Sequence, residues 1–489
     1  MAQHPQDRAP AQAAGLTPRP SHARVAALFL RLLGGIHVVA FLSLGTQVLG
    51  LVGSQGILPA SEFLREAAAA TGPERYALLP TLFWLDASDT ALVGACAAGA
   101  LLGALLGLGF APFLLLLALW ALYLSLVSVG RVFLGYQWDG LLLEATLVAL
   151  PMAPLGWRPQ SREPAAAALA LPRFLLFRLM LASGLAKLLS GDALWRDLQA
   201  LRVHYETQPL PTWIGFYAHQ LPAWAQALSC LLMFVIELLV PFFLLGPRRV
   251  RRLAFGPLVL LQVLIAATGN YAFFNLLTLA LCLTLLDDAD LPGWKPRPFP
   301  ASGRARRVAA WVAAVVLIGL SLLPFLGPLV RLPWPRPLLG AYELVAPFRS
   351  LNSYGLFAVM TPERPEIQLE GSRDGVEWRP YRFRYKPGDS KRAPGFVAPH
   401  QPRLDWQMWF AALRGRCEAE PWMLRFLERL REGAPEVLSL LAEDPFPGSR
   451  PGFLRARLLS YRFTSLREQR ATGDYWRIDD RGPYCADLR

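Results

Sequence analysis

The stretch LAFGPLVLLQVLIAATGNYAFFNLLTLALCLTLL, residues 253–286, decides how this chain is organised. It is too long for one straight membrane helix, because about 20 apolar residues at 1.5 Å per residue already cross roughly 30 Å of hydrocarbon. Thr268-Gly269-Asn270-Tyr271 interrupts the apolar run. We therefore expect either a tight helical hairpin of two short crossings or a broken helix.

Arginines on both sides of this stretch favour the hairpin. They are Arg248, Arg249, Arg251 and Arg252 before it, and Arg304, Arg306 and Arg307 after it. Such clusters stay in the cytoplasm under the positive-inside rule. A hairpin keeps both clusters on that side, together with Arg19, Arg24 and the loop 158–162, whereas a single crossing would separate them.

Further apolar runs predict the remaining spans, at about residues 25–52, 90–109, 112–130, 141–156, 169–189, 227–246 and 308–330. The expected fold is an α-helical multi-pass membrane bundle over residues 25–330, with about eight or nine crossings. Residues 1–24, rich in Pro, Ala, Gln and Arg, are predicted to be a disordered cytoplasmic tail. The segments 53–89 and 190–226 are expected outside the cytoplasm.

The composition agrees with a membrane protein. Of the 489 residues 54% are apolar and 17% charged, against roughly 45–50% and 25% in soluble domains. The net charge is +13, but the 49 basic residues include only four lysines, which indicates a bias of the coding sequence. We expect membrane lipids as partners and no nucleic acid.

After Arg331 the chain becomes polar, and residues 331–489 are expected to form a small β-rich mixed domain outside the cytoplasm. Residues 332–337 would form a stiff linker. The expected elements are a β-hairpin of residues 366–370 and 377–385, a helix over 421–442 and a strand over 455–464. Cys417 and Cys485 could pair in an oxidising compartment, but the sequence leaves open whether they approach each other.

Acidic side chains mark the segment 135–144, where Asp139 lies at the mouth of a predicted span and Glu144 about one turn inside it. Carboxylates at that depth are costly in lipid and usually line a cavity or belong to a paired site. The alternative is anchoring at the interface by Tyr136 and Trp138, with Asp139 in water.

Lys187 is the one lysine in a predicted span. Arginine would snorkel to the interface equally well, whereas an ammonium is compact and can lose its proton when desolvated. We expect Lys187 to point into the bundle near Glu237 or Glu144, as a buried pair or as a base; the alternative is a simple anchor. Arg178, nine residues earlier, should face a different side of the same helix.

Two polar segments, together with Asp139, are candidate partner-binding regions. His204 and Glu206, with His219, could form a polar cluster, or they could belong to a structural loop, since their spacing is not that of a zinc motif. Arg349, Asn352 and Tyr354 could bind a partner's backbone or cap the first strand of the tail domain. No cofactor or metal motif is present, and no nucleophile elbow or phosphate-binding loop.

Several strings, in this order, resemble the lipase maturation factor family: GYQWDGLLLEA (135–145), RLMLASGLAKLLSGDALWRDLQAL (178–201), TGNYAFFNLLTLAL (268–281), FRSLNSYGLFAVMTPERPEI (348–367) and LDWQMWFAAL (404–413). The similarity extends from about Val25 to Arg489. It implies a multi-pass membrane protein that assists the folding of secreted lipases in the endoplasmic reticulum, with a lumenal C-terminal domain. The arginine-rich composition looks bacterial, which would place the tail domain in the periplasm.

The spans are also distantly similar to the membrane half of vitamin K-dependent carboxylase. That resemblance implies an active-site base at Lys187, which stands in a matching Gly-x-x-Lys-Leu context. Our leading prediction is a maturation factor without chemistry of its own. The alternatives are an intramembrane enzyme for a lipid or quinone-like substrate, with Lys187 as base and Glu144 or Glu237 nearby, and a transporter using the break at residues 269–270.

Overall fold

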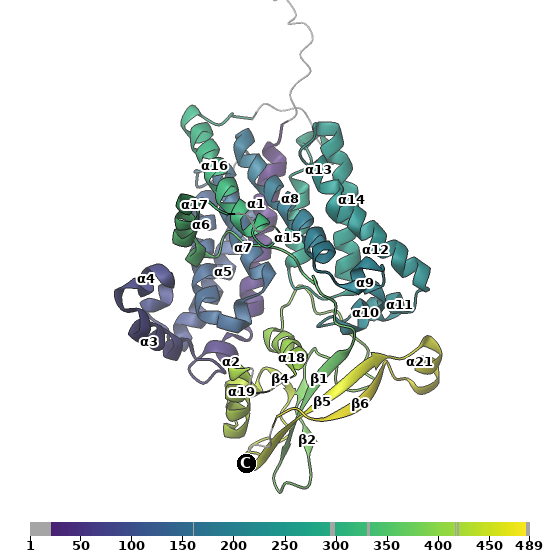
Figure 1. The fold of residues 1–489 in the computed structure, drawn as a ribbon. Coiled ribbons are helices and arrows are strands. Elements are labelled where there is room, and N and C mark those ends of the chain that lie inside the picture. Colours follow the sequence, from purple (N-terminus) through teal and green to yellow (C-terminus); the bar gives the residue numbers. More distant parts are fainter. Residues whose placement is uncertain are drawn as a thin grey trace, which may run out of the picture.

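The structure is a computed structural model that describes residues 21–159, 161–293, 299–329, 333–415, 417 and 420–485. A bundle of helices occupies one end of the molecule, and a tail domain with an antiparallel sheet lies against the other end (Figure 1). Most of the tail predicted over residues 1–24, up to residue 20, lies outside the described residues.

Seven helices within the described residues are long and apolar enough to cross a membrane. They are α1 (Ala23–Gly45), α5 (Asp89–Leu108), α6 (Pro112–Gly130), α8 (Ala166–Leu189), α12 (Ala223–Leu238), α14 (Arg248–Thr268) and α16 (Arg304–Leu326). Two shorter helices, α7 (Gln137–Ala149) and α15 (Phe274–Leu283), lie among them (Figure 1). The fold is the predicted multi-pass helical bundle.

Small residues allow α1 and α5 to pack closely. A side chain at Gly34 of α1 would place its Cβ 2.5 Å from the backbone nitrogen of Gly107 in α5. Gly103, also in α5, lies against Gly34 as well. Lipid offers no hydrophobic drive for helix association, so close backbone contact supplies the dispersion energy instead. The first span is shorter than predicted, because α1 ends at Gly45 and Val48–Val52 form a separate short helix, α2.

The long apolar stretch breaks where the sequence predicts. Helix α14 ends at Thr268 and α15 begins at Phe274 and packs against it. The Asn270 side chain fixes the bend, since it donates to Gly395 O at 2.9 Å and accepts the Val397 N–H at 2.7 Å. The turn between the two helices is thereby bonded to the tail domain.

The starts of α14 and α16, which carry the two arginine clusters, lie at the end of the bundle away from the tail domain (Figure 1). There Arg248 and Arg251 contact the buried carboxylate of Asp287, which also lies 2.8 Å from His22 Nε2. The segments 53–89 and 190–226 lie at the opposite end and contact the tail domain, as the Glu62–Arg425 ion pair at 3.1 Å illustrates. Their helices are α3 (Ala60–Thr71), α4 (Arg75–Leu78), α9 (Ala193–Arg196), α10 (Ala200–Thr207) and α11 (Trp213–His219).

The tail domain contains a four-stranded antiparallel sheet of order β2-β1-β5-β6 and a two-stranded sheet of β3 and β4. The strands are β1 (Arg364–Ser372), β2 (Arg379–Pro380), β3 (Arg382–Phe383), β4 (Leu441–Glu443), β5 (Phe453–Phe463) and β6 (Trp476–Pro483). The helices are α18 (Arg403–Arg414), α19 (Pro421–Glu432), α20 (Pro435–Leu438) and α21 (Leu466–Thr472).

Two expected tail elements differ in length from the structure. The predicted β-hairpin forms between β1 and β2, but the strand expected over 377–385 divides at Tyr381, where the chain leaves β1 to pair with β4. The helix expected over 421–442 ends at Glu432, because Gly433 adopts a positive φ of 68° and Pro435 follows. The linker expected over residues 332–337 is also shorter than predicted, because helix α17 (Arg336–Val345) begins within it.

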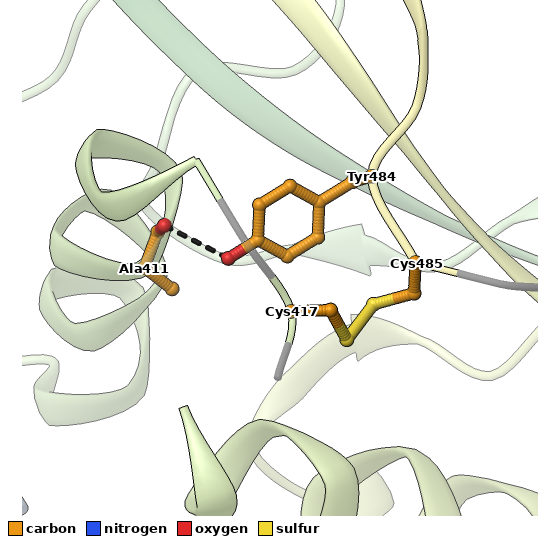
Figure 2. Close-up of a disulfide and its surroundings, with 4 residues drawn as sticks. All are labelled: Ala411, Cys417, Tyr484 and Cys485. Carbon is orange, nitrogen blue, oxygen red and sulfur yellow. Dashed lines mark hydrogen bonds between the residues drawn. A yellow bond between two sulfur atoms is a disulfide. The ribbon is translucent and has the colours of Figure 1, made fainter. Parts of the chain in front are cut away.

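Cys417 and Cys485 form a disulfide, with their Cα atoms 5.2 Å apart (Figure 2). Beside it the Tyr484 hydroxyl donates to Ala411 O at 2.9 Å. The disulfide joins the end of β6 to the loop after α18. The sequence alone left open whether these two cysteines approach each other. The other three cysteines, Cys96, Cys230 and Cys282, are buried and free, as their apolar surroundings predict.

Candidate functional site

A buried ion pair lies in the interior of the bundle between Glu144 of α7 and Arg178 of α8. Neither side chain is more than 2% exposed. The remaining oxygen of Glu144 accepts the Asn352 N–H at 3.1 Å and the Tyr354 hydroxyl at 2.6 Å, and Arg178 donates to Asn352 O at 3.2 Å. Two desolvated charges are tolerated only when such additional hydrogen bonds complete the pair.

The segment that supplies these bonds comes from beyond the last span. Residues 350–360 run between the bundle helices on their way to β1: Trp120 donates to Ser350 Oγ at 2.8 Å and Trp195 to Phe357 O at 2.9 Å. The structure thus uses Asn352 and Tyr354 inside the molecule, where the sequence suggested a partner contact or a strand cap. Arg349 is exposed, and its role as a partner contact stays a prediction.

Lys187 points into the bundle and pairs with Glu237 of α12, which is one of the two acids that the sequence predicted as its partner. Its ammonium donates to both carboxylate oxygens at 2.8 and 3.0 Å and to Ser183 O at 3.3 Å. Lys187 is 6% and Glu237 4% exposed. Because an ammonium has three N–H groups, these acceptors use all of them. Glu144 pairs with Arg178 instead, so Arg178 and Lys187 do face different sides of α8.

A third buried ion pair joins the tail domain to the bundle. Arg403, at the start of α18, makes a bidentate contact with Asp139 of α7 at 2.8 and 2.9 Å and also donates to Phe133 O at 2.6 Å. The Tyr123 hydroxyl donates to the same carboxylate at 2.5 Å. Asp139 is 0% exposed, so the interpretation that placed it in water is wrong. The carboxylate oxygens of Asp139 accept hydrogen bonds from Tyr123 and from Arg403, and Arg403 lies 264 positions away along the chain.

The outer polar segment 204–219 also contacts the tail domain. Glu206 accepts the Phe463 N–H at 2.8 Å and lies 3.8 Å from His219 Nε2. Burial lowers the pKa of His219 and raises the pKa of Glu206. His204 does not join them: it lies 3.1 Å from the Tyr271 hydroxyl, and burial, with the charge of Lys187, lowers its pKa to about 4.

These polar groups form bonds between elements rather than a ligand set. Among the residues that the structure describes, no group of three His, Cys, Asp or Glu side chains is arranged to hold a metal ion. Sequence reasoning missed Arg403 as the partner of Asp139. Nothing local marks it, since it is one of many arginines and its partner lies in a distant span.

The fold and these contacts define a class: an integral membrane protein whose helical bundle holds an extramembrane domain against one end by buried ionic bonds. The family model for the lipase maturation factor transmembrane domain matches residues 24–293, and the model for the C-terminal domain of the same family matches residues 350–486. The chain belongs to the lipase maturation factor family.

Lipase maturation factors of known name are similar to this chain along nearly its whole length. Lipase maturation factor 2 of Gallus gallus is 36% identical over 573 residues, covering 92% of this chain and 79% of that protein. The human protein of the same name is 37% identical, covering 92% and 80%. Lipase maturation factor 1 of Mus musculus is 35% identical, covering 94% and 86%. These relatives are named as maturation factors and not as enzymes, and no solved structure matches the chain.

Proposed function

We propose that this chain is a membrane-embedded factor that assists the folding of a secreted lipase and performs no covalent chemistry itself. The observation that carries the proposal is similarity to lipase maturation factors through both the bundle and the tail domain. A partly folded secreted protein exposes apolar surface and unpaired strand edges, and holding it until it assembles prevents aggregation.

The position of the tail domain supports this function. The outer segments and the tail domain lie together at the end of the bundle opposite the starts of α14 and α16, which carry the arginine clusters (Figure 1). We place this end of the molecule in the periplasm of a bacterial cell, which corresponds to the lumen of the endoplasmic reticulum in eukaryotic relatives, with the N-terminus in the cytoplasm. A client that has just crossed the membrane would meet this end first.

Co-expression with a secreted lipase tests the proposal. In cells that lack the gene, we expect the lipase to be synthesised but to accumulate in an inactive or aggregated form, and a plasmid copy should restore its specific activity. An unrelated secreted enzyme serves as the control and should be unaffected. Unchanged lipase activity and solubility in the deletion strain would contradict the function.

Variants of the Lys187–Glu237 pair distinguish the hypothesis of a folding factor from that of an intramembrane enzyme. Lys187→Met alone leaves a buried carboxylate unpaired, at a cost of about 3–5 kcal/mol, so the protein level should fall. Replacing both residues, Lys187→Met with Glu237→Leu, removes both charges and should restore the level and the maturation of lipase. A double variant that is stable and abundant but inactive in maturation would favour chemistry at this pair instead.

A further inference from the structure

Three large aromatic side chains form an exposed cluster where the tail domain meets the bundle. Trp213 and Tyr217 belong to α11, and Phe396 belongs to the tail-domain loop that Asn270 holds. The ring centroid of Trp213 lies 5.9 Å from that of Phe396 and 6.3 Å from that of Tyr217. Each of these three side chains, the aromatic cluster, is about half exposed. Apolar surface gathered in this way marks a contact with a partner or with lipid.

The aromatic cluster lies at the level where α14 leaves the membrane. Helix α14 has 21 residues, which at 1.5 Å each cover about 31 Å, close to the thickness of the hydrocarbon layer. Its arginines lie at one end and Thr268 at the other. The Thr212 hydroxyl, directly before α11, donates to Ala267 O at 2.7 Å, and Asn270 bonds the loop 395–397. Both parts of the cluster are thus fixed at the boundary between hydrocarbon and headgroups.

Exposed apolar side chains continue from the aromatic cluster along the spans. On α14 they include Leu260, Val263 and Leu264, and on α12 they include Trp224, beside the first residue of that helix. Both helices cross the membrane, so these side chains face lipid. Helix α11 packs against α14 near its tail-domain end (Figure 1). The cluster therefore extends the lipid-facing surface of the spans onto the tail domain.

The opposite side of the bundle has a similar exposed surface at the same end. Tyr76 and Leu78 of α4 are exposed, as are Leu82 and Leu85, a few residues before α5 begins at Asp89. Figure 1 shows α4 and α11 on opposite sides of the bundle, both at its tail-domain end. Aromatic and apolar side chains at the ends of spans are typical of the belt that anchors a protein in the membrane interface.

We propose that the aromatic cluster lies between the headgroups and the acyl chains of the leaflet on the tail-domain side. Tryptophan and tyrosine favour this region, because one end of the side chain is apolar and the other forms hydrogen bonds. Phe396 belongs to the tail domain, so the tail domain rests on the membrane surface. Lipid thereby supports the tail domain in addition to the Asp139–Arg403 pair. The inference goes beyond the proposed function, because it does not depend on any client.

Spin labels on the full-length protein in phosphatidylcholine nanodiscs test the inference. A nitroxide is attached to Phe396→Cys and, as the matched control, to Val376→Cys. Val376 is exposed in the turn between β1 and β2, at the end of the tail domain away from the bundle (Figure 1). Oxygen concentrates in lipid and a neutral nickel chelate in water. We expect the label at residue 396 to collide preferentially with oxygen, and the label at residue 376 with the chelate.

Two results would overturn the inference. A preference for the nickel chelate at both positions would place Phe396 in water. Low collision rates with both reagents at residue 396 would show that protein, such as a second copy of the chain, covers the cluster. Tyr217→Cys is an independent position on α11 that should match Phe396→Cys, and it decides if Phe396→Cys does not fold. Labelling of the parent protein measures the background from its buried free cysteines.

The rate of alkylation gives a second measurement with the same variants. A membrane-impermeant anionic maleimide should react with Phe396→Cys at least about tenfold more slowly than with Val376→Cys, because an ionic reagent is costly to move out of water. Phe396 is 48% and Val376 79% exposed, so burial by the protein does not account for such a difference. Both thiols should react equally fast in denaturant. Comparable rates in nanodiscs would contradict contact with lipid.

Discussion

At the scale of single residues, Arg403 and Asp139 carry the junction between the tail domain and the bundle. Arg403→Met leaves Asp139 buried without a countercharge, so we expect a loss of about 3–5 kcal/mol in stability. Thermal unfolding of the purified protein in detergent measures it.

The ion pair Glu62–Arg425 provides a matched control across the same junction. Both of its side chains are more than a third exposed, so Arg425→Ala should cost no more than about 1 kcal/mol. Equal losses for Arg403→Met and Arg425→Ala would show that burial of the Asp139 pair does not determine the stability of the junction.

Asp405 gives the tail domain a pH-dependent stability. Its Oδ1 accepts the N–H groups of Tyr385 at 3.0 Å and Lys386 at 2.8 Å, and burial raises its pKa to about 6. The folded state therefore binds this proton more tightly than the unfolded state, whose pKa is about 3.9. The resulting stabilisation is fully present below about pH 4 and is lost as the pH rises through 6.

Asp405→Asn keeps an Oδ1 acceptor for both N–H groups but removes the charge. We expect the variant to match the parent protein near pH 4 and to exceed it at pH 7 by up to about 3 kcal/mol, the equivalent of two pKa units. The midpoint of thermal unfolding, measured from pH 4 to pH 7 for both proteins, checks this. A difference that does not change with pH would contradict it.

At the scale of elements, the Cys417–Cys485 bond holds the end of β6 against the loop after α18 (Figure 2). It closes a loop with a sequence separation of 68 residues, for which the chain-entropy relation gives about 4 kcal/mol. Replacing both cysteines by serine should destabilise the tail domain by up to that amount.

Thiol counting checks the bond itself. In denaturant without reductant, the three free cysteines should react with an alkylating reagent, and all five should react after reduction. Five reactive thiols in both conditions would reject the disulfide.

At the scale of the whole molecule, the arginine clusters and the tail domain lie at opposite ends of the bundle (Figure 1). An alkaline phosphatase fused after Arg489 should therefore be active, because that enzyme folds only in an oxidising compartment. A fusion after Gly246, at the arginine end, should be inactive. A well-expressed but inactive fusion after Arg489 would reverse the topology.

The sequence by itself determined the multi-pass helical bundle, the break near Asn270, the β1–β2 hairpin and the family. These features are local: apolar length, arginine position and strand alternation are each readable within about 20 residues. It also indicated that Lys187 needs an intramembrane acid, since lysine at that depth is otherwise costly.

Only the tertiary structure decided which charges meet. Asp139 finds Arg403 at a separation of 264 residues, and Glu144 is completed by Asn352 at 208. Neither partner carries a local pattern that reveals it. The stability of a desolvated ion pair depends on its surroundings. Coulomb attraction offsets the desolvation penalty only when both groups and their hydrogen bonds are in place. That condition is set by packing between distant elements, and no single segment of the chain contains it.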